Sequence, residues 1–209
     1  MATISEPRQA RSRATWARVL DAGLELLEEG GYAALTVDAI CARAGTTPPA
    51  VYARAGNKDG LLLAIYEHAM ERIDASTIDP DDPAWDGLPA DALVRRAIEA
   101  VCRGWLENAG LLRPIVHRAG HDEEIFGRGS AASRELGAAF RAVLARAGAA
   151  KRDADFCFRI AYAAMVQRVM YGADFESGLA LSDKALVERL GNAAVAYLGL
   201  TTSSGSSSS

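Results

Sequence analysis

The chain has 209 residues, 50% of them hydrophobic and 24% charged, with a net charge of −4, so it can bury a core in one large domain or two small ones. Alanine, leucine, arginine and glutamate outnumber the β-branched residues, and this composition favours helices. The sequence has no apolar run of the roughly eighteen residues that a transmembrane helix needs, and no apolar segment follows the first basic residues as in a signal peptide.

The three cysteines lie far apart, without a CxxC pair, at Cys41, Cys102 and Cys157. An odd, scattered set of cysteines is typical of buried thiols in a reducing compartment rather than of a disulfide framework. We therefore expect a cytoplasmic protein.

The charge is unevenly distributed along the chain. Residues 1–18 contain four arginines and one glutamate, a net charge of +3, whereas residues 1–60 contain seven basic and seven acidic side chains. The acidic excess lies in the remainder. Residues 1–13 are expected to form a flexible basic arm whose arginines can follow phosphates without sequence preference. A disordered tail without such a role is an equal alternative.

A first long helix is expected over about residues 14–29, ended by the glycine pair at positions 30 and 31. Its apolar stripe consists of Trp16, Val19, Leu20, Gly23, Leu24 and Leu27.

The segment 36–63 predicts two short helices and the start of a third. Apolar residues from Val37 to Ala44 recur at helical spacing, Thr36 precedes them as an N-cap, and Gly45 follows where a left-handed residue is tolerated. Thr46 or Thr47 can cap the next helix. Two short helices joined by a tight glycine-containing turn form a helix-turn-helix unit, whose second helix fits the major groove of DNA.

That second helix has Pro48 at its first position, where the missing N–H is not needed. Gly56 and Asn57 end it, and Asn57 can cap a third helix that continues to about residue 75.

From about Thr15 to Met70 the sequence resembles the TetR family of bacterial transcriptional regulators. The residues that carry the resemblance are Leu24, Leu27, Gly31, Tyr32, Thr36, Ile40, Ala44, Gly45, Thr47, Val51, Tyr52, Asn57, Lys58, Asp59, Leu61 and Leu62. The resemblance implies an all-α fold of about nine helices. It implies a DNA-binding domain over residues 14–60, with the helix-turn-helix at 36–55, and a ligand-binding and dimerisation domain over residues 61–200. Residues 201–209 (TTSSGSSSS) are expected to be disordered.

The resemblance also implies roles for individual residues in DNA binding. Thr36, Thr47, Tyr52 and Lys58 match positions that contact phosphate, and Arg54 occupies a position that is often histidine. The remaining candidates read or approach the bases: Thr46, Pro48, Pro49 and Ala50.

Two prolines and Ala55 depart from the family pattern, which often has a polar residue, a glycine and an aromatic residue at these positions. Prolines cannot hydrogen-bond to base edges through their side chains. Apolar contact with a thymine methyl and readout of DNA shape are therefore expected to matter more than usual.

After the proline-rich and aspartate-rich loop 76–89, we expect helices at about residues 91–108, 111–119 and 130–147. A turn or short helix is expected at 121–126. Two long helices, at about residues 153–171 and 182–198, end the ordered chain. In the family the last two helices pair with those of a second copy, and the alanine-rich face of residues 193–196 allows such close approach. A homodimer is therefore expected.

The resemblance implies a pocket for a small effector in the second domain. The candidate lining residues are Trp105, Ile115, His117, Phe126, Phe140, Phe158, Tyr162, Met165 and Met170. They suggest a mainly apolar ligand, with His117, His121 or Tyr162 as polar partners. The same residues also suit an ordinary core. A cavity of several hundred cubic ångströms between the middle helices would indicate a sensor, and a filled core would indicate a DNA binder without effector.

His117 and His121 are four residues apart and are followed by acidic residues, which raises a metal site as a minor alternative. Gly120 lies between them and interrupts a shared helical face, so we expect no metal and no cofactor. The sequence contains no GxSxG, Walker A, Rossmann or HExxH motif, and Cys41 lies on an apolar face, so we do not expect an enzyme. The prediction is a dimeric DNA-binding repressor that a small ligand releases from its operator.

Overall fold

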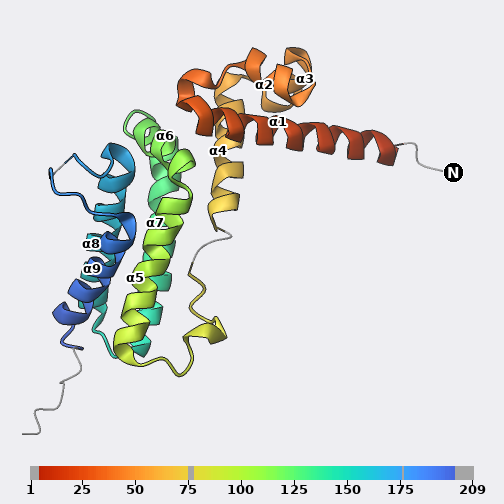
Figure 1. Ribbon diagram of the computed structural model, residues 1–209. Helices are drawn as coiled ribbons and strands as arrows, with labels where there is room; N and C mark the ends of the chain where they lie inside the picture. The colour runs from red at the N-terminus through yellow and green to blue at the C-terminus, as the bar shows by residue number, and fades with distance from the viewer. Residues whose placement is uncertain (1–4, 75–77, 176, 201–209) are drawn as a thin grey trace, which may run out of the picture. The chain divides into compact units, whose positions relative to one another are not determined.

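The computed structural model describes the backbone of residues 5–74, 78–175 and 177–200 (Figure 1). Within these residues the chain forms nine α-helices and one short 3₁₀ helix, and no strand, as the composition predicted. The chain folds as two compact units, an N-terminal unit of residues 1–75 with 110–125 and a C-terminal unit of residues 76–109 with 126–209. No helix in the described part of the chain is long and apolar enough to cross a lipid bilayer.

The N-terminal unit contains α1 (Ser5–Ala34), α2 (Val37–Ala44), α3 (Pro48–Ala55), α4 (Lys58–Asp74) and most of α6 (Ala109–Ala119). Its core is apolar. Helices α1, α2, α3 and α4 all contribute core side chains that are at most 1% exposed: Leu24, Ile40, Val51, Leu61 and Ile65.

Helix α1 corrects the predicted start of the first helix. It begins at Ser5 rather than near residue 14, so residues 5–13, expected as a flexible arm, are helical. The sequence SEPRQARSR explains this, since it lacks glycine and has its proline in the first turn, where a helix tolerates it. Residues 1–4 of that arm lie outside the described residues, as does the predicted tail 201–209. Gly31 (φ 62°) breaks the helix at the glycine pair, as the sequence predicted.

The C-terminal unit contains α5 (Ala90–Glu107), α7 (Glu123–Arg146) from residue 126, α8 (Lys151–Tyr171) and α9 (Asp183–Tyr197). Helix α5 packs on both α8 and α9. Four fully buried side chains from α5, α7 and α8 form the centre of this unit, namely Val94, Phe140, Leu144 and Met165.

Helix α7 is continuous where the sequence predicted a turn or short helix at 121–126 and a separate helix from 130. It starts after Asp122, whose carboxylate accepts the Ile125 N–H at 3.2 Å, and it runs through Gly127 and Gly129. Each glycine disfavours a helix by only about 1 kcal/mol, and burial of Ile125 and Phe140 at either side outweighs that cost. Similarly, α6 begins at Ala109, so only Asn108 separates it from α5.

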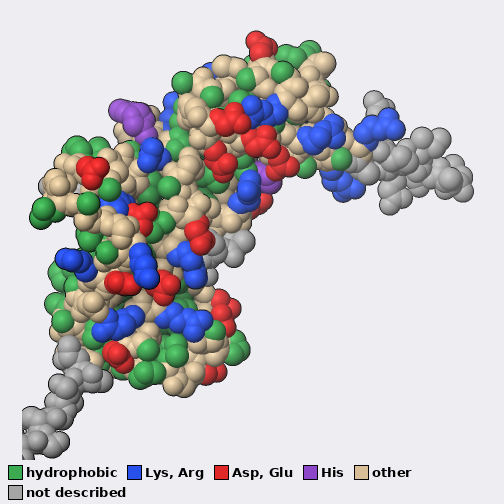
Figure 2. Space-filling model, in the orientation of Figure 1, with side chains coloured by type: hydrophobic (Ala, Val, Ile, Leu, Met, Phe, Trp, Pro, Cys, Tyr) green, Lys and Arg blue, Asp and Glu red, His purple; other side chains and the backbone are tan. Residues whose placement is uncertain are grey.

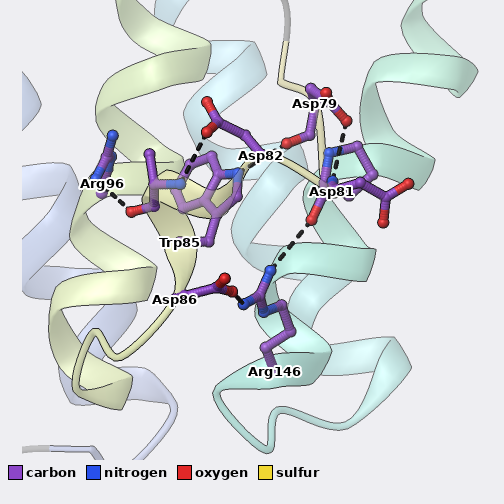
Figure 3. Close-up of polar contacts among 9 residues, drawn as sticks. Asp79, Asp81, Asp82, Trp85, Asp86, Arg96 and Arg146 are labelled. Atoms are coloured by element: carbon purple, nitrogen blue, oxygen red, sulfur yellow. Dashed lines mark hydrogen bonds and ion pairs between the residues drawn. The ribbon is translucent and has the colours of Figure 1, made fainter.

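The loop before α5 is folded onto the C-terminal unit around Trp85 (Figure 3). The Trp85 ring is 5% exposed, and its Nε1–H donates to the Asp79 carbonyl at 2.7 Å. The Arg96 guanidinium lies over that ring at 5.1 Å and donates to the Ala84 carbonyl. Arg146 pairs with Asp86 on the other side. Trp85 is therefore a hydrophobic anchor of this loop.

Candidate nucleic-acid interface

The helix-turn-helix has the capping pattern that the sequence predicted. The Thr36 hydroxyl accepts the Ala39 N–H at 3.2 Å at the start of α2, and Gly45 ends α2 in the left-handed conformation (φ 63°). Thr47 is the N-cap residue of α3 and makes no side-chain capping bond. Its hydroxyl is therefore available to another partner.

Helix α3 is anchored by one side and exposed on the other. Val51 is 1% exposed and packs inward, whereas Tyr52 is 38% exposed. The other predicted DNA-binding side chains are accessible too: Thr36, Thr47, Pro49, Ala50, Arg54 and Lys58 are exposed, and Thr46 and Pro48 are half-buried. The structure thus brings these residues onto α3 and the turns at its ends, except for Thr36, which lies at the start of α2.

The turn between α3 and α4 holds Lys58 near the end of α3. Asn57 caps α4, since its Oδ1 accepts the Gly60 N–H at 2.8 Å, and Gly56 turns the chain with φ 77°. Lys58 is the first residue of α4 and is exposed. Its ammonium group and the free N–H groups of this helix end can both attract an anion.

Contacts between distant positions brace the unit, and the sequence did not suggest them. Arg43 forms a two-pronged pair with Glu29, with both N···O distances at 2.9 Å, and this hydrogen bond lowers the pKa of the Glu29 carboxyl. The Arg18 Nε–H donates to the Ala44 carbonyl at 3.2 Å, at the C-terminal end of α2. These bonds join α1 to α2 and so fix the base on which α3 rests.

Arg54 is held by α1 rather than projecting freely. Its guanidinium lies over the Trp16 ring at 5.3 Å, and Nη1 donates to the Ser12 carbonyl at 3.4 Å. Ser12 and Trp16 are 42 and 38 positions away in the sequence, so no local spacing could have indicated this arrangement.

The candidate effector residues do not form one group. Seven of the nine belong to the C-terminal unit, whereas Ile115 (buried) and His117 (exposed) belong to the N-terminal unit. Phe126 is 62% exposed. The structure brings together Trp105, Tyr162, Phe158 and Phe140, and it places Met165 and Met170 on the same helix as two of these.

These four rings form a chain of contacts. Trp105 meets Tyr162 edge-on with centroids 5.0 Å apart, Tyr162 lies 5.5 Å from Phe158, and Phe158 lies 5.6 Å from Phe140. The Tyr162 hydroxyl forms a 2.6 Å hydrogen bond with Ser133, a partner that the sequence did not indicate. The cluster therefore consists of four aromatic rings and one pair of hydrogen-bonded hydroxyl groups, those of Ser133 and Tyr162.

The two histidines that suggested a metal site lie on exposed positions. Their ring centroids are 6.0 Å apart, and the neighbouring Asp122 is bonded to Arg118 instead. The Ile125 N–H and then Arg118 lower the pKa of the Asp122 carboxyl. Among the described residues, no group of three histidine, cysteine or acidic side chains is placed to hold a metal ion.

Comparison with known proteins agrees with this geometry. Residues 19–65 match the model of a family described as bacterial regulatory proteins, tetR family. The chain is similar to the solved structure of Salmonella enterica GusR, with a TM-score of 0.64 and 19% identity over 88% of this chain and 95% of that chain. It is also similar to a TetR transcriptional regulator from Agrobacterium tumefaciens, with a TM-score of 0.62 and 26% identity over 90% and 94%. No curated protein matches it.

An all-helical fold with an N-terminal helix-turn-helix defines the class of protein, a DNA-binding transcriptional regulator. The N-terminal domain of the chain, over residues 19–65, is that of the tetR family of bacterial regulatory proteins.

Proposed function

We propose that this protein is a dimeric repressor that binds an operator through α3 and leaves it when a small, mainly apolar ligand binds the C-terminal unit. The observation that carries the proposal is the α2–turn–α3 geometry. Thr36 caps α2, Gly45 makes the turn, and Val51 fixes α3 so that its N-terminal residues remain accessible. An exposed helix held in this way is suited to the major groove.

The contacts to DNA divide into two kinds. The hydroxyls of Thr36, Thr47 and Tyr52, with Lys58, bind phosphates and set the register of α3. Thr46 donates to a base edge, while Pro48, Pro49 and Ala50 contact thymine methyl groups. Few polar groups on α3 face the bases, so operator shape contributes much of the specificity.

The double substitution Tyr52→Phe with Lys58→Ala tests the phosphate contacts. Each change removes a donor that meets a charged oxygen, a bond worth roughly 1.5 kcal/mol or more. We expect affinity for every duplex to fall by about tenfold or more, with a smaller dependence on salt. Lys151→Ala, which removes an exposed charge from α8, is the matched control. Equal affinities of the double variant and wild type would contradict these roles.

Dimerisation is supported by an apolar surface on α8 and α9. Phe156, Ile160 and Tyr171 lie along one side of α8 and are 45%, 44% and 59% exposed. Tyr197 of α9 is 52% exposed, and its ring lies 5.0 Å from that of Phe156, so the two helices share one continuous surface. Soluble monomers rarely expose a large contiguous apolar patch, and pairing with a second copy would cover this one.

Ile160→Glu tests the interface by placing a carboxylate in its centre. We expect sedimentation to show a monomer, and affinity for a two-fold symmetric operator to fall because a monomer contacts one half-site. Ala145→Glu adds the same charge at an exposed position of α7 and should remain dimeric. A monomeric wild-type protein would refute the dimer.

Ligand release is supported by the aromatic cluster around Tyr162. An apolar ligand that separates the Trp105, Phe158 and Tyr162 rings would gain their contact and the hydroxyl pair of Ser133 and Tyr162. DNA binding requires the two recognition helices of the dimer to be about 34–36 Å apart. The ligand therefore lowers DNA affinity by as much as it prefers a conformation with another spacing.

A second candidate function is a DNA binder with a filled core and no effector. The close ring contacts favour it, since Phe140 and Met165 are fully buried and the Tyr162 hydroxyl is already bonded. Selection of bound fragments from random DNA, repeated with a metabolite panel, separates the two. A compound that releases the fragments and shifts tryptophan fluorescence supports the sensor, whereas a panel without effect supports the filled core.

A further inference from the structure

A groove of about 460 Å³ separates the N-terminal half of α1 from α3. Its floor is apolar, formed by Trp16, Val19 and Val51, and its rim is polar, formed by Arg11, Ser12, Thr15, Thr46 and Arg54. We propose that this groove binds the sugar–phosphate backbone of duplex DNA beside the strand that α3 reads, so that α1 is a second DNA-contacting helix. The inference rests on the proposed function, because it extends the contact surface of α3.

The chemistry of the lining residues selects an anion. Arg11 and Arg54 bring two guanidinium groups, Ser12 and Thr46 bring hydroxyl donors, and the lining includes no carboxylate among the described side chains. A guanidinium binds phosphate oxygens in a two-pronged geometry that an ammonium group cannot match. The apolar floor suits the carbon atoms of the sugar ring. A cation or a neutral apolar molecule fits this combination poorly.

The groove is continuous with the surface that we propose to read DNA. Thr46 and Ala50 line it and also belong to the accessible N-terminal end of α3 and the turn before it. A backbone strand that passes α3 can therefore continue into the groove without leaving the protein surface. This continuity favours duplex DNA over a free metabolite as the occupant.

The groove is pre-formed by bonds across it and beneath it. Arg54 reaches from α3 to Ser12 and Trp16 of α1, so one of the two guanidiniums is already positioned. Arg18 bonds both the Thr15 hydroxyl and the Ala44 carbonyl, each at 3.2 Å, which fixes α1 against the end of α2. Binding then costs less ordering entropy than it would with free arginine side chains.

The charge along α1 agrees with contact at its N-terminal half only. Figure 2 shows Lys and Arg side chains over the N-terminal half of α1, where Arg11, Arg13 and Arg18 lie. The acidic residues of the helix begin at Asp21 among the described side chains and continue to Glu29. A polyanion is therefore attracted to the half that lines the groove and repelled by the other half.

Arg11→Ala and Arg13→Ala provide a matched test. Both arginines are exposed, two residues apart on α1, and carry the same charge, but only Arg11 lines the groove. With a fluorescent mixed-sequence duplex, we expect Arg11→Ala to weaken binding about fivefold to tenfold. The slope of log affinity against log salt should fall by about one for each bound protomer. Arg13→Ala removes only the longer-range attraction of a screened charge, so it should weaken binding by less than about twofold.

A second pair of variants leaves the charge unchanged. Ala53 lines the groove and Ala17 does not, although both are exposed helix residues of the same unit. Ala53→Phe fills the groove and should weaken binding at least about fivefold if a bonded phosphate is displaced, whereas Ala17→Phe should bind like wild type. Circular dichroism verifies that each variant is folded.

The outcomes separate this inference from the proposed function. If the variant with Tyr52→Phe and Lys58→Ala binds weakly while Arg11→Ala equals Arg13→Ala, the groove is not a DNA site but α3 remains one. If Ala53→Phe equals Ala17→Phe, the groove site is overturned in the same way. If wild type binds no duplex at low salt, both proposals are refuted.

Discussion

Gly60 provides a sharp test of how α3 and α4 are packed. It is the third residue of α4, and a Cβ atom built there would lie 2.2 Å from the carbonyl oxygen of Ala55, the last residue of α3. Ordinary contact begins at 3.4 Å. Because the obstructing atom belongs to the backbone and not to a flexible side chain, Gly60→Ala requires the α3–α4 turn to move by roughly 1 Å.

The magnitude follows from two opposed effects. Overpacking of this kind costs about 1–3 kcal/mol, and alanine gains about 1 kcal/mol over glycine in a helix. We expect Gly60→Ala to lose up to about 2 kcal/mol of unfolding free energy in the N-terminal unit. DNA affinity should fall as well, since displacement of the turn moves α3.

Urea unfolding followed by circular dichroism and tryptophan fluorescence measures the change, with the two signals fitted separately because two units can unfold in separate steps. The control is Gly127→Ala in α7, where no described heavy atom lies within 4 Å of a Cβ atom, so we expect a gain of about 0.5–1 kcal/mol. If Gly60→Ala stabilises the protein as Gly127→Ala does, the packing of the turn is not as described.

Three further predictions concern single side chains. Thr36→Ala removes the cap of α2 and should cost about 1 kcal/mol in urea unfolding, while Thr36→Ser should retain most of it. The hydrogen bond from Arg159 lowers the pKa of the Asp155 carboxyl, so its stabilising effect is present above the unfolded pKa of about 4 and is lost as the pH falls through the lower folded value. Asp155→Asn should therefore flatten the loss of melting temperature in acid, and an unchanged profile would exclude this pair as a cause. Burial raises the pKa of the Cys102 thiol to about 12, so a chromogenic disulfide reagent should label it in urea but not in buffer.

The helix-turn-helix could be predicted closely from the sequence. The bounds of α2 are those expected, and α3 begins at Pro48 and ends before Gly56 as expected. Their caps and the left-handed Gly45 depend on interactions within about four residues of chain, and such local interactions are visible in residue order. The all-helical class follows for the same reason, because it reflects composition and periodicity.

Contacts between distant residues depended on the tertiary structure. The pair of Arg43 and Glu29 and the stacking of Arg54 on Trp16 join positions that have no periodic relation. The groove beside α3 includes Arg11 and Ser12 because α1 is already helical at these residues. The continuity of α7 was likewise decided by burial at both ends of its glycine-containing segment. Local sequence thus determined which helices form and where they are capped. Packing between helices, whose energy comes from side chains far apart in the chain, decided which residues lie together at the site.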